Sequence, residues 1–126
     1  MIPKEIKWFW QRGTRGWADS DVWSIDWFLC DIMPPMLKQL KKNKMGYPCG
    51  TSQKKWEKIL DDIAYMFETA HEIQDMQAVF PEKKKATESM NQHRKKYKIK
   101  VLTKEEFARY NKGWKLFQEY FYSLWD

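Results

Sequence analysis

Apolar side chains recur every three or four residues toward the end of the chain, which is the spacing of one face of an α-helix. Thr103 precedes this run and Glu106 stands three positions later, the pairing of a capping box at a helix start. Leu102 and Phe107 stand where a hydrophobic staple needs apolar residues. Gly113, beside the stripe, would let another helix approach closely. The pattern predicts a helix from Thr103 onward with this inward stripe: Phe107, Tyr110, Trp114, Phe117, Phe121 and Leu124.

A second helix is predicted from Thr51 or Ser52 to Phe80, because either hydroxyl can cap its start and Pro81 follows its end. We expect one face to be buried and the opposite face to be solvated. The inward stripe alternates steps of four and three: Trp56, Leu60, Ile63, Phe67 and Ala70. The outer face is acidic: Glu57, Asp61, Asp62, Glu68, Glu72 and Asp75.

A third helix is predicted to start near Asp19 or Ser20, and its two apolar rows indicate a central position in the fold. The rows expected to face inward are Val22, Ile25, Leu29, Ile32 and Met33, with Trp23, Trp27 and Cys30. Pro34 and Pro35 should end or kink this helix. A further helical stretch is then expected over residues 36–44, with these residues inward: Met36, Leu37 and Leu40.

Three long helices with one or two short ones predict an all-α fold, a compact helical bundle. The chain of 126 residues is about one domain, so residues 1–126 are expected to form a single helical domain. No apolar run approaches the roughly 20 residues of a membrane span, and the start of the chain does not resemble a signal peptide. We therefore expect a cytoplasmic protein without a membrane partner, in which Cys30 is a buried thiol and Cys49 a loop thiol.

Residues that could hold a metal or catalyse a reaction are sparse. Glu68 and His71 form one Glu-x-x-His pair, but a di-iron site in a bundle needs a second pair and two further inward glutamates. His93, the other histidine, has Met90 three residues before it. The acidic cluster at residues 19–26 suits the positive end of a helix better than a metal ion. We expect no cofactor, no metal and no catalytic residues, and we do not favour an enzyme.

Residues 1–16 form an aromatic N-terminal arm, either extended or a short helix. Its candidate partner-binding residues are aromatic and arginine side chains: Trp8, Trp10, Arg12, Arg15 and Trp17. Exposed aromatic residues beside arginine make good anchors for a protein partner. The alternative is that these aromatic residues cap the core of the bundle. Arg12 or Arg15 would also be the natural partner of Asp26 if that carboxylate is buried.

The basic connecting segment, residues 82–100, carries the net charge of the whole chain. It holds eight basic and two acidic residues, whereas the remaining residues balance, so it accounts for the formal excess of +6. Clustered cations neutralise phosphates, and His93 and Tyr97 can stack on bases, so one interpretation is nucleic-acid binding. The other is docking on the acidic face of the helix predicted over residues 51–80. The candidate binding residues are Lys83, Lys84, Lys85, Arg94, Lys95 and Lys96.

Several stretches of the chain form a recognisable set: residues 15–26, 32–40, 46–48, 113–117, 120–121 and 124–126. As a set they resemble a family of small uncharacterised proteins encoded by tailed bacteriophages. The basic segment lies outside this resemblance. The resemblance implies a phage origin and action in the cytoplasm of the host bacterium, and it carries no catalytic residues.

These features favour a non-enzymatic phage accessory protein that binds a host macromolecule. A host protein is the first hypothesis, with a component of antiviral defence as one candidate. Nucleic-acid binding through residues 82–100 is the alternative, followed by a metal-dependent enzyme and, last, by a minor component of the virion. The sequence leaves the oligomeric state open.

Overall fold

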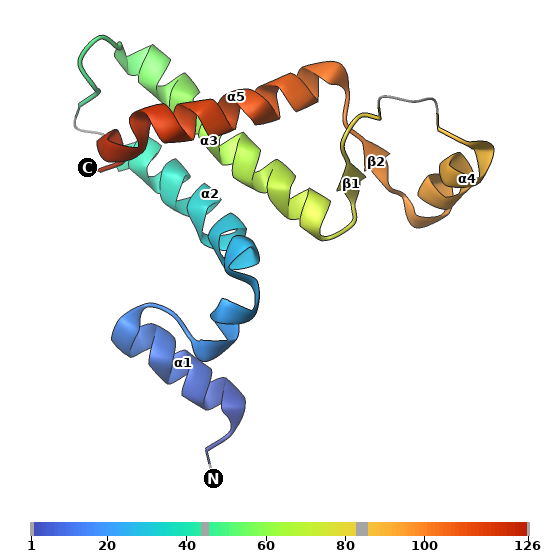
Figure 1. The fold of residues 1–126 in the computed structure, drawn as a ribbon. Coiled ribbons are helices and arrows are strands. Elements are labelled where there is room, and N and C mark those ends of the chain that lie inside the picture. Colours follow the sequence, from blue (N-terminus) through green and yellow to red (C-terminus); the bar gives the residue numbers. More distant parts are fainter. Residues whose placement is uncertain (1, 44–45, 83–85, 126) are drawn as a thin grey trace.

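The computed structural model describes three stretches of the chain: residues 2–43, 46–82 and 86–125. Three long helices form the bundle: α2 (Ile25–Asn43), α3 (Gln53–Gln74) and α5 (Lys104–Tyr120). α3 lies between α2 and α5 and contacts both of them (Figure 1). The prediction of an all-α bundle with three long helices and shorter additional ones is confirmed.

The core gathers around α3, whose predicted stripe is buried. Its fully covered members come from α2 and α3: Cys30, Leu37, Trp56, Ile59, Leu60, Ile63, Ala64, Met66 and Phe67. α5 adds aromatic rings over this cluster. Phe117 packs edge-to-face on Phe67 with 5.2 Å between ring centroids, and Tyr120 packs on Trp56 at 5.6 Å. Such aromatic pairs add about 0.5–1.5 kcal/mol each beyond the area that they bury.

Gly113 is the point of closest approach between α5 and α3. A Cβ atom placed on it would lie 2.4 Å from the Cβ of Met66 and 2.7 Å from the carbonyl oxygen of Asp62. No side chain fits at such distances unless the helices move apart, which confirms the predicted close approach. The capping box at the start of α5 is also present, since Thr103 and Glu106 each accept the other's backbone N–H at 3.1 Å.

Asp62 lies in the interface between α3 and α5, with 1% of its side chain exposed. The expectation of a solvated position is wrong because α5 crosses α3 on this side. Lys58 Nζ and Arg109 Nε donate to Oδ1 of Asp62 at 2.8 and 2.9 Å, and Lys112 Nζ lies 3.7 Å from Oδ2. Burial by itself would raise the pKa of Asp62, but the hydrogen bonds from Lys58 and Arg109 hold this pKa below its usual value.

α2 differs from the prediction in where it begins, where it ends and which side it buries. A 3-10 helix, η1 (Asp19–Ser24), precedes it, and α2 continues through Pro34 and Pro35 to Asn43. The two prolines remove N–H donors, while packing against α3 supports the helix along its length. Its buried residues are Cys30, Pro34 and Leu37, as expected for two of them. Much of the row predicted to face inward is exposed instead: Val22, Trp23, Ile25, Trp27, Leu29 and Met36.

α3 ends at Gln74, earlier than the predicted end at Phe80. Met76 takes a left-handed backbone conformation, with φ at 60°, and turns the chain out of the helix. The strand β1 (Ala78–Val79) then pairs in parallel with β2 (Lys100–Val101). Residues 97–101 alternate between apolar and charged side chains, as in a strand, and the partner of this strand lies 22 positions earlier in the sequence.

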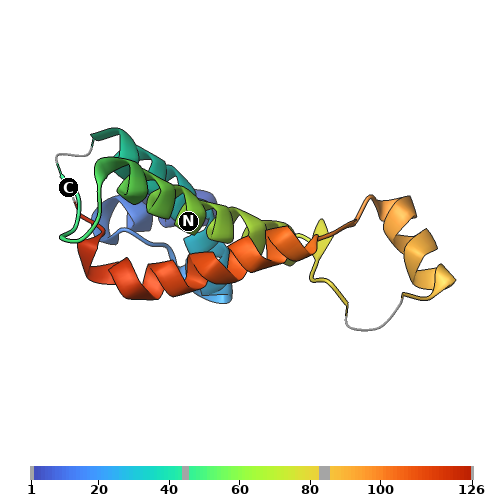
Figure 2. The same cartoon turned by 90° about the horizontal axis from the view of Figure 1, so that it is seen from above.

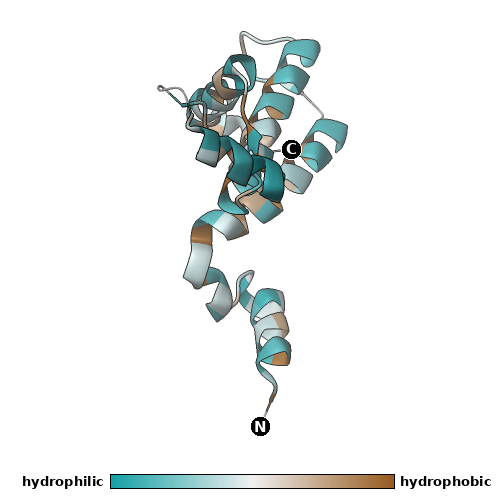
Figure 3. Cartoon of the chain, turned by 90° about the vertical axis from the view of Figure 1, so that its right-hand side faces the viewer, coloured by the Kyte–Doolittle hydropathy of each residue, from teal (hydrophilic) through white to brown (hydrophobic). Residues whose placement is uncertain are grey.

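Two helices lie outside the bundle, on different sides of it (Figures 1 and 2). α1 (Lys4–Arg15) is joined to the bundle through η1, and α4 (Glu88–Tyr97) lies beyond the β1–β2 pair. A final 3-10 helix, η2 (Phe121–Ser123), follows α5. Figure 3 shows α1 as a lobe beside the bundle, with apolar residues along it.

Candidate functional site

α1 turns its apolar side toward solvent. Ile6, Phe9 and Trp10 of α1 are exposed, as are Ile2 before the helix and Trp17 after it. Phe9 is 78% exposed and Trp10 is 70% exposed. At roughly 200 Å² for a whole aromatic side chain, Phe9, Trp10 and Trp17 together present about 400 Å² of apolar surface. A patch of this size on a single chain is often functional.

The polar side of α1 attaches it to η1. Arg12 donates two hydrogen bonds to Asp21, at 3.1 Å from Nε and 2.7 Å from a terminal nitrogen. Arg15 donates to Asp19 at 2.5 Å and stacks on the ring of Trp17 at 3.7 Å. The hydrogen bond from Arg12 lowers the pKa of Asp21, and hydrogen bonds from Gln11 and Arg15 lower the pKa of Asp19. These ion pairs lie at the surface, so salt should weaken them.

The aromatic arm therefore does not cover the core of the bundle, contrary to one of the two expectations. Trp8 alone among its candidate residues is half-buried, and it packs edge-to-face on Trp23 of η1 at 5.5 Å. Asp26 is exposed and does not pair with Arg12 or Arg15. It accepts hydrogen bonds from Ser24 and from Gln74 of α3 instead.

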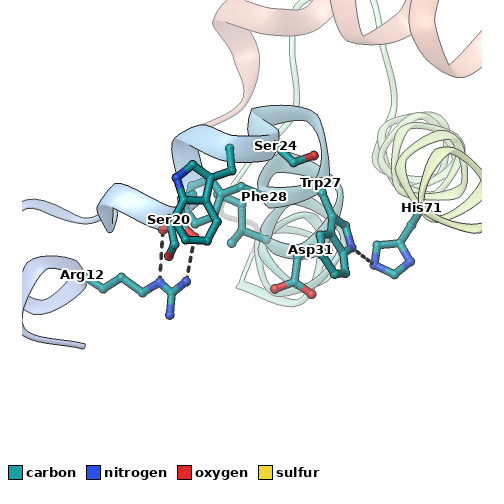
Figure 4. A pocket seen from close by; sticks show the side chains of 10 residues that line it. Arg12, Ser20, Ser24, Trp27, Phe28, Asp31 and His71 are labelled. Atoms are coloured by element: carbon teal, nitrogen blue, oxygen red, sulfur yellow. Dashed lines mark hydrogen bonds and ion pairs between the residues drawn. The ribbon is translucent and has the colours of Figure 1, made fainter. Parts of the chain in front are cut away.

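A cleft of about 650 Å³ opens where α1, η1, α2 and α3 meet (Figure 4). Its volume is in the range of small-molecule and side-chain pockets. Its lining combines apolar side chains, three of them aromatic, with polar and charged ones: Arg12, Ser20, Asp21, Trp23, Ser24, Trp27, Phe28, Asp31, Ile32 and His71. Together with the apolar side of α1, this cleft makes up what we call the N-terminal surface.

His71 of α3 fixes the position of Trp27 in the cleft. The indole Nε1–H of Trp27 donates to Nε2 of His71 at 2.8 Å, and the other ring nitrogen of His71 lies 3.2 Å from Oδ2 of Asp75. A nitrogen that accepts carries no proton, so this geometry requires the neutral form of His71 with its proton on Nδ1. The sequence predicts Trp27 in an inward row and His71 in an incomplete Glu-x-x-His pair, and no signal in the sequence joined the two.

Asp31 lies one helical turn beyond Trp27, and Figure 4 shows its carboxylate beside the Trp27 ring. Within the described residues Asp31 makes no hydrogen bond, and its negative charge attracts Arg12, which also lines the cleft. The regular spacing of Trp23, Trp27 and Asp31 is a signal that could have been read from the sequence as a row of one helix.

The candidate residues of the basic segment that the structure describes, Arg94, Lys95 and Lys96, lie on α4. Arg94 pairs with Glu82 inside the segment, while Lys95 and Lys96 are exposed on α4. Lys38 and Lys41 of α2 pair with two of the α3 acids, Glu68 and Asp61, at 2.6 and 3.0 Å. Among the described residues of the segment, Lys100 at its end interacts electrostatically with Glu72 of α3, which agrees with the expected docking at that one position. The predicted residues Lys83, Lys84 and Lys85 lie outside the described residues.

The described residues contain no group of three or more histidine, cysteine or acidic side chains placed to hold a metal ion. None of their helices is long and apolar enough to cross a membrane. Cys30 is buried and Cys49 exposed, both as free thiols, as the sequence predicts. Burial raises the pKa of the Cys30 thiol, so it is a poor nucleophile. Comparisons of the chain with protein-family models, with curated proteins and with solved structures found no match.

Proposed function

We propose that this protein is a non-enzymatic bacteriophage accessory protein that binds a host protein through its N-terminal surface. The resemblance to small phage proteins motivates the origin, the host cytoplasm as the place of action and antiviral defence as the first source of targets. The observation that carries the proposal is the orientation of α1, which is held by its polar side and presents Phe9 and Trp10 to solvent.

Exposing such a face costs free energy in an isolated chain, because each aromatic side chain stays in contact with water. A partner that covers it recovers this energy, and aromatic residues dominate the energetics of many protein interfaces. The ion pairs to η1 hold α1 in a defined orientation, which lowers the entropy cost of binding. These features support a binding surface.

The test is affinity capture from host lysate with the full chain and two variants. Phe9→Ser combined with Trp10→Ser removes two exposed rings of α1. Tyr122→Ser is the matched control, because Tyr122 is 89% exposed on η2, away from this surface. We expect the same host protein with the wild type and the control and its loss with the double variant. Finding no specific host protein, or one that the double variant retains, would contradict the proposal.

Nucleic-acid binding through residues 82–100 is the second candidate function, and the position of α4 favours it. α4 extends beyond the bundle, Tyr97 is exposed, and His93 packs against it at 4.7 Å. Lys96 lies over the Tyr97 ring at 5.4 Å. Stacking rings beside cations suit single-stranded nucleic acid.

A gel-shift assay over a salt series tests this candidate. Lys95→Gln, Lys96→Gln and Lys98→Gln together should weaken binding. They should also reduce the slope of the logarithm of the binding constant against the logarithm of the salt concentration, by about three at most. The control changes Lys54, Lys55 and Lys115 to glutamine, which removes the same charge elsewhere. Equal losses in both triple variants would show that the net charge, and not α4, is responsible.

A further inference from the structure

The cleft of the N-terminal surface combines exposed indole rings with one carboxylate. Trp23 is 76% exposed and Trp27 is about half exposed, so their rings are open to a ligand. Phe28 adds a third aromatic wall. An indole face attracts cations because of its electron-rich centre, and the attraction grows when the site excludes water.

The charged groups that line the cleft are Arg12, Asp21 and Asp31, which sum to one negative charge. Arg12 hydrogen-bonds to Asp21 and also attracts the charge of Asp31, while His71 is neutral because it accepts the hydrogen bond from Trp27. Asp31 accepts no hydrogen bond among the described residues, so its oxygens are left for a donor. A ligand that brings one positive charge would complement it, whereas an anion would be repelled.

The same chain already contains the matching arrangement a few residues away. Arg15 stacks on the ring of Trp17 at 3.7 Å and binds the carboxylate of Asp19 at 2.5 Å. Arg109 combines a ring and a carboxylate in the same way, with Tyr65 at 4.1 Å and Asp62 at 2.9 Å. Trp27 and Asp31 offer the ring and the carboxylate of such a trio.

We propose that the cleft receives an arginine side chain of the partner protein, with its guanidinium stacked on Trp27 or Trp23 and paired with Asp31. A planar guanidinium suits this site better than an ammonium, because it stacks on a ring and donates two parallel hydrogen bonds to one carboxylate. This inference rests on the proposed function and names the chemistry of the partner.

The test uses the full-length protein and a capped peptide, acetyl-Gly-Gly-Arg-Gly-Gly-amide. A second peptide carries citrulline, which has nearly the same shape as arginine but no charge. The indole N–H signals of Trp23 and Trp27 in a nitrogen-15 spectrum report binding. We expect saturable shifts with the arginine peptide and binding at least about fivefold weaker with citrulline.

Two variants test whether the carboxylate of Asp31 is the charge that pairs with the arginine. Asp31→Asn keeps the shape of the side chain and should weaken binding of the arginine peptide about three- to tenfold. Glu119→Gln, at an exposed position of α5, is the control and should leave binding unchanged. Equal binding of both peptides, or no effect of Asp31→Asn, would overturn the inference.

The outcome separates this inference from the proposed function. If Asp31→Asn still captures a host protein that Phe9→Ser with Trp10→Ser loses, the arginine site is wrong while the proposed function stands. If the arginine peptide binds in an Asp31-dependent way and no host protein is captured, the site stands without the function. Concentration-dependent self-association that Asp31→Asn abolishes would overturn the assignment to a different protein, because a second copy would then supply the cation.

Discussion

α5 and α1 are both amphipathic helices rich in aromatic residues, yet they use their two faces in opposite ways. α5 packs part of its aromatic side on α3, with Phe117 on Phe67 and Gly113 at a close approach. Two residues of its predicted inward stripe, Trp114 and Phe121, are 44% and 53% exposed, because they lie at the edge of this contact. α1 attaches through Arg12 and Arg15 and leaves Phe9 and Trp10 in water. The contact of α5 with α3 forms part of the fold, whereas the contact of α1 with η1 leaves apolar side chains of α1 on the surface. The comparison shows that an amphipathic pattern predicts a helix but does not decide which of its faces is covered.

The largest expected effect comes from filling the space at Gly113. Gly113→Ala should lower the free energy of unfolding by about 1–3 kcal/mol, because its Cβ meets Met66 and backbone of α3, and this outweighs the gain in helix propensity. Urea unfolding followed by circular dichroism measures it. Gly13→Ala is the control on α1, where no atom lies within 4 Å, and it should not destabilise the protein. Equal effects at both glycines would break the distinction between the two helices.

The second effect concerns the buried charge of the α3–α5 interface. Asp62→Asn should cost about 1–2 kcal/mol near neutral pH, discounted because Lys58, Arg109 and Lys112 remain partly exposed. The pKa of Asp62 is lowered in the folded state, so its carboxylate stabilises the protein above its unfolded pKa of about 4, and this contribution is lost as the pH falls through the folded pKa. The difference from the wild type should therefore shrink below about pH 4. A difference that stays constant into acid would contradict the role of the charge.

The third effect should be confined to α1. Arg12→Gln removes both hydrogen bonds to Asp21, so we expect backbone amides of α1 to exchange about two- to fivefold faster while those of α3 are unchanged. Hydrogen exchange measured by mass spectrometry resolves the two helices. Raising the salt concentration should also speed amide exchange in α1 of the wild type, because salt screens the same ion pairs. Faster exchange in α3 as well would show that α1 supports the bundle.

The smallest effect on stability is expected at the most exposed ring of the proposed contact. Trp10→Ser should change the free energy of unfolding by no more than about 0.5 kcal/mol, since the side chain is 70% exposed. Urea unfolding at two protein concentrations checks this. A loss of 2 kcal/mol or more would indicate that Trp10 is covered in solution and would remove the contrast with α5.

Local patterns predicted the elements well where their cause is local. The capping box of Thr103 and Glu106, the stripe of α3 and the close approach at Gly113 depend on residues a few positions apart or on the absence of a side chain. The errors occur where distant residues decide. α3 stops before Phe80 because residues 78–79 pair with residues 100–101, and α2 continues past Pro34 while packed against α3.

The candidate site was predicted in part. The aromatic arm and its arginines were identified from composition, although Arg12 and Arg15 bind Asp21 and Asp19 and not Asp26. The cleft was missed, because it needs His71 beside Trp27, and these two residues are separated by 44 positions. Asp31 was not predicted as a site residue, because acidic residues are common on helices and only the tertiary structure places this one in a cleft.

The sequence by itself determined that this chain forms helices, where α3 and α5 begin and that its net charge resides in residues 82–100, because propensity, N-capping and charge are local properties. Only the tertiary structure decided which faces are covered. α2 contacts α3 through one of its sides, and the apolar residues on its other side and on η1 stay exposed to water. α1 satisfies its arginines on η1 and thereby turns its aromatic side outward, since ion pairs on one face fix the direction of the other.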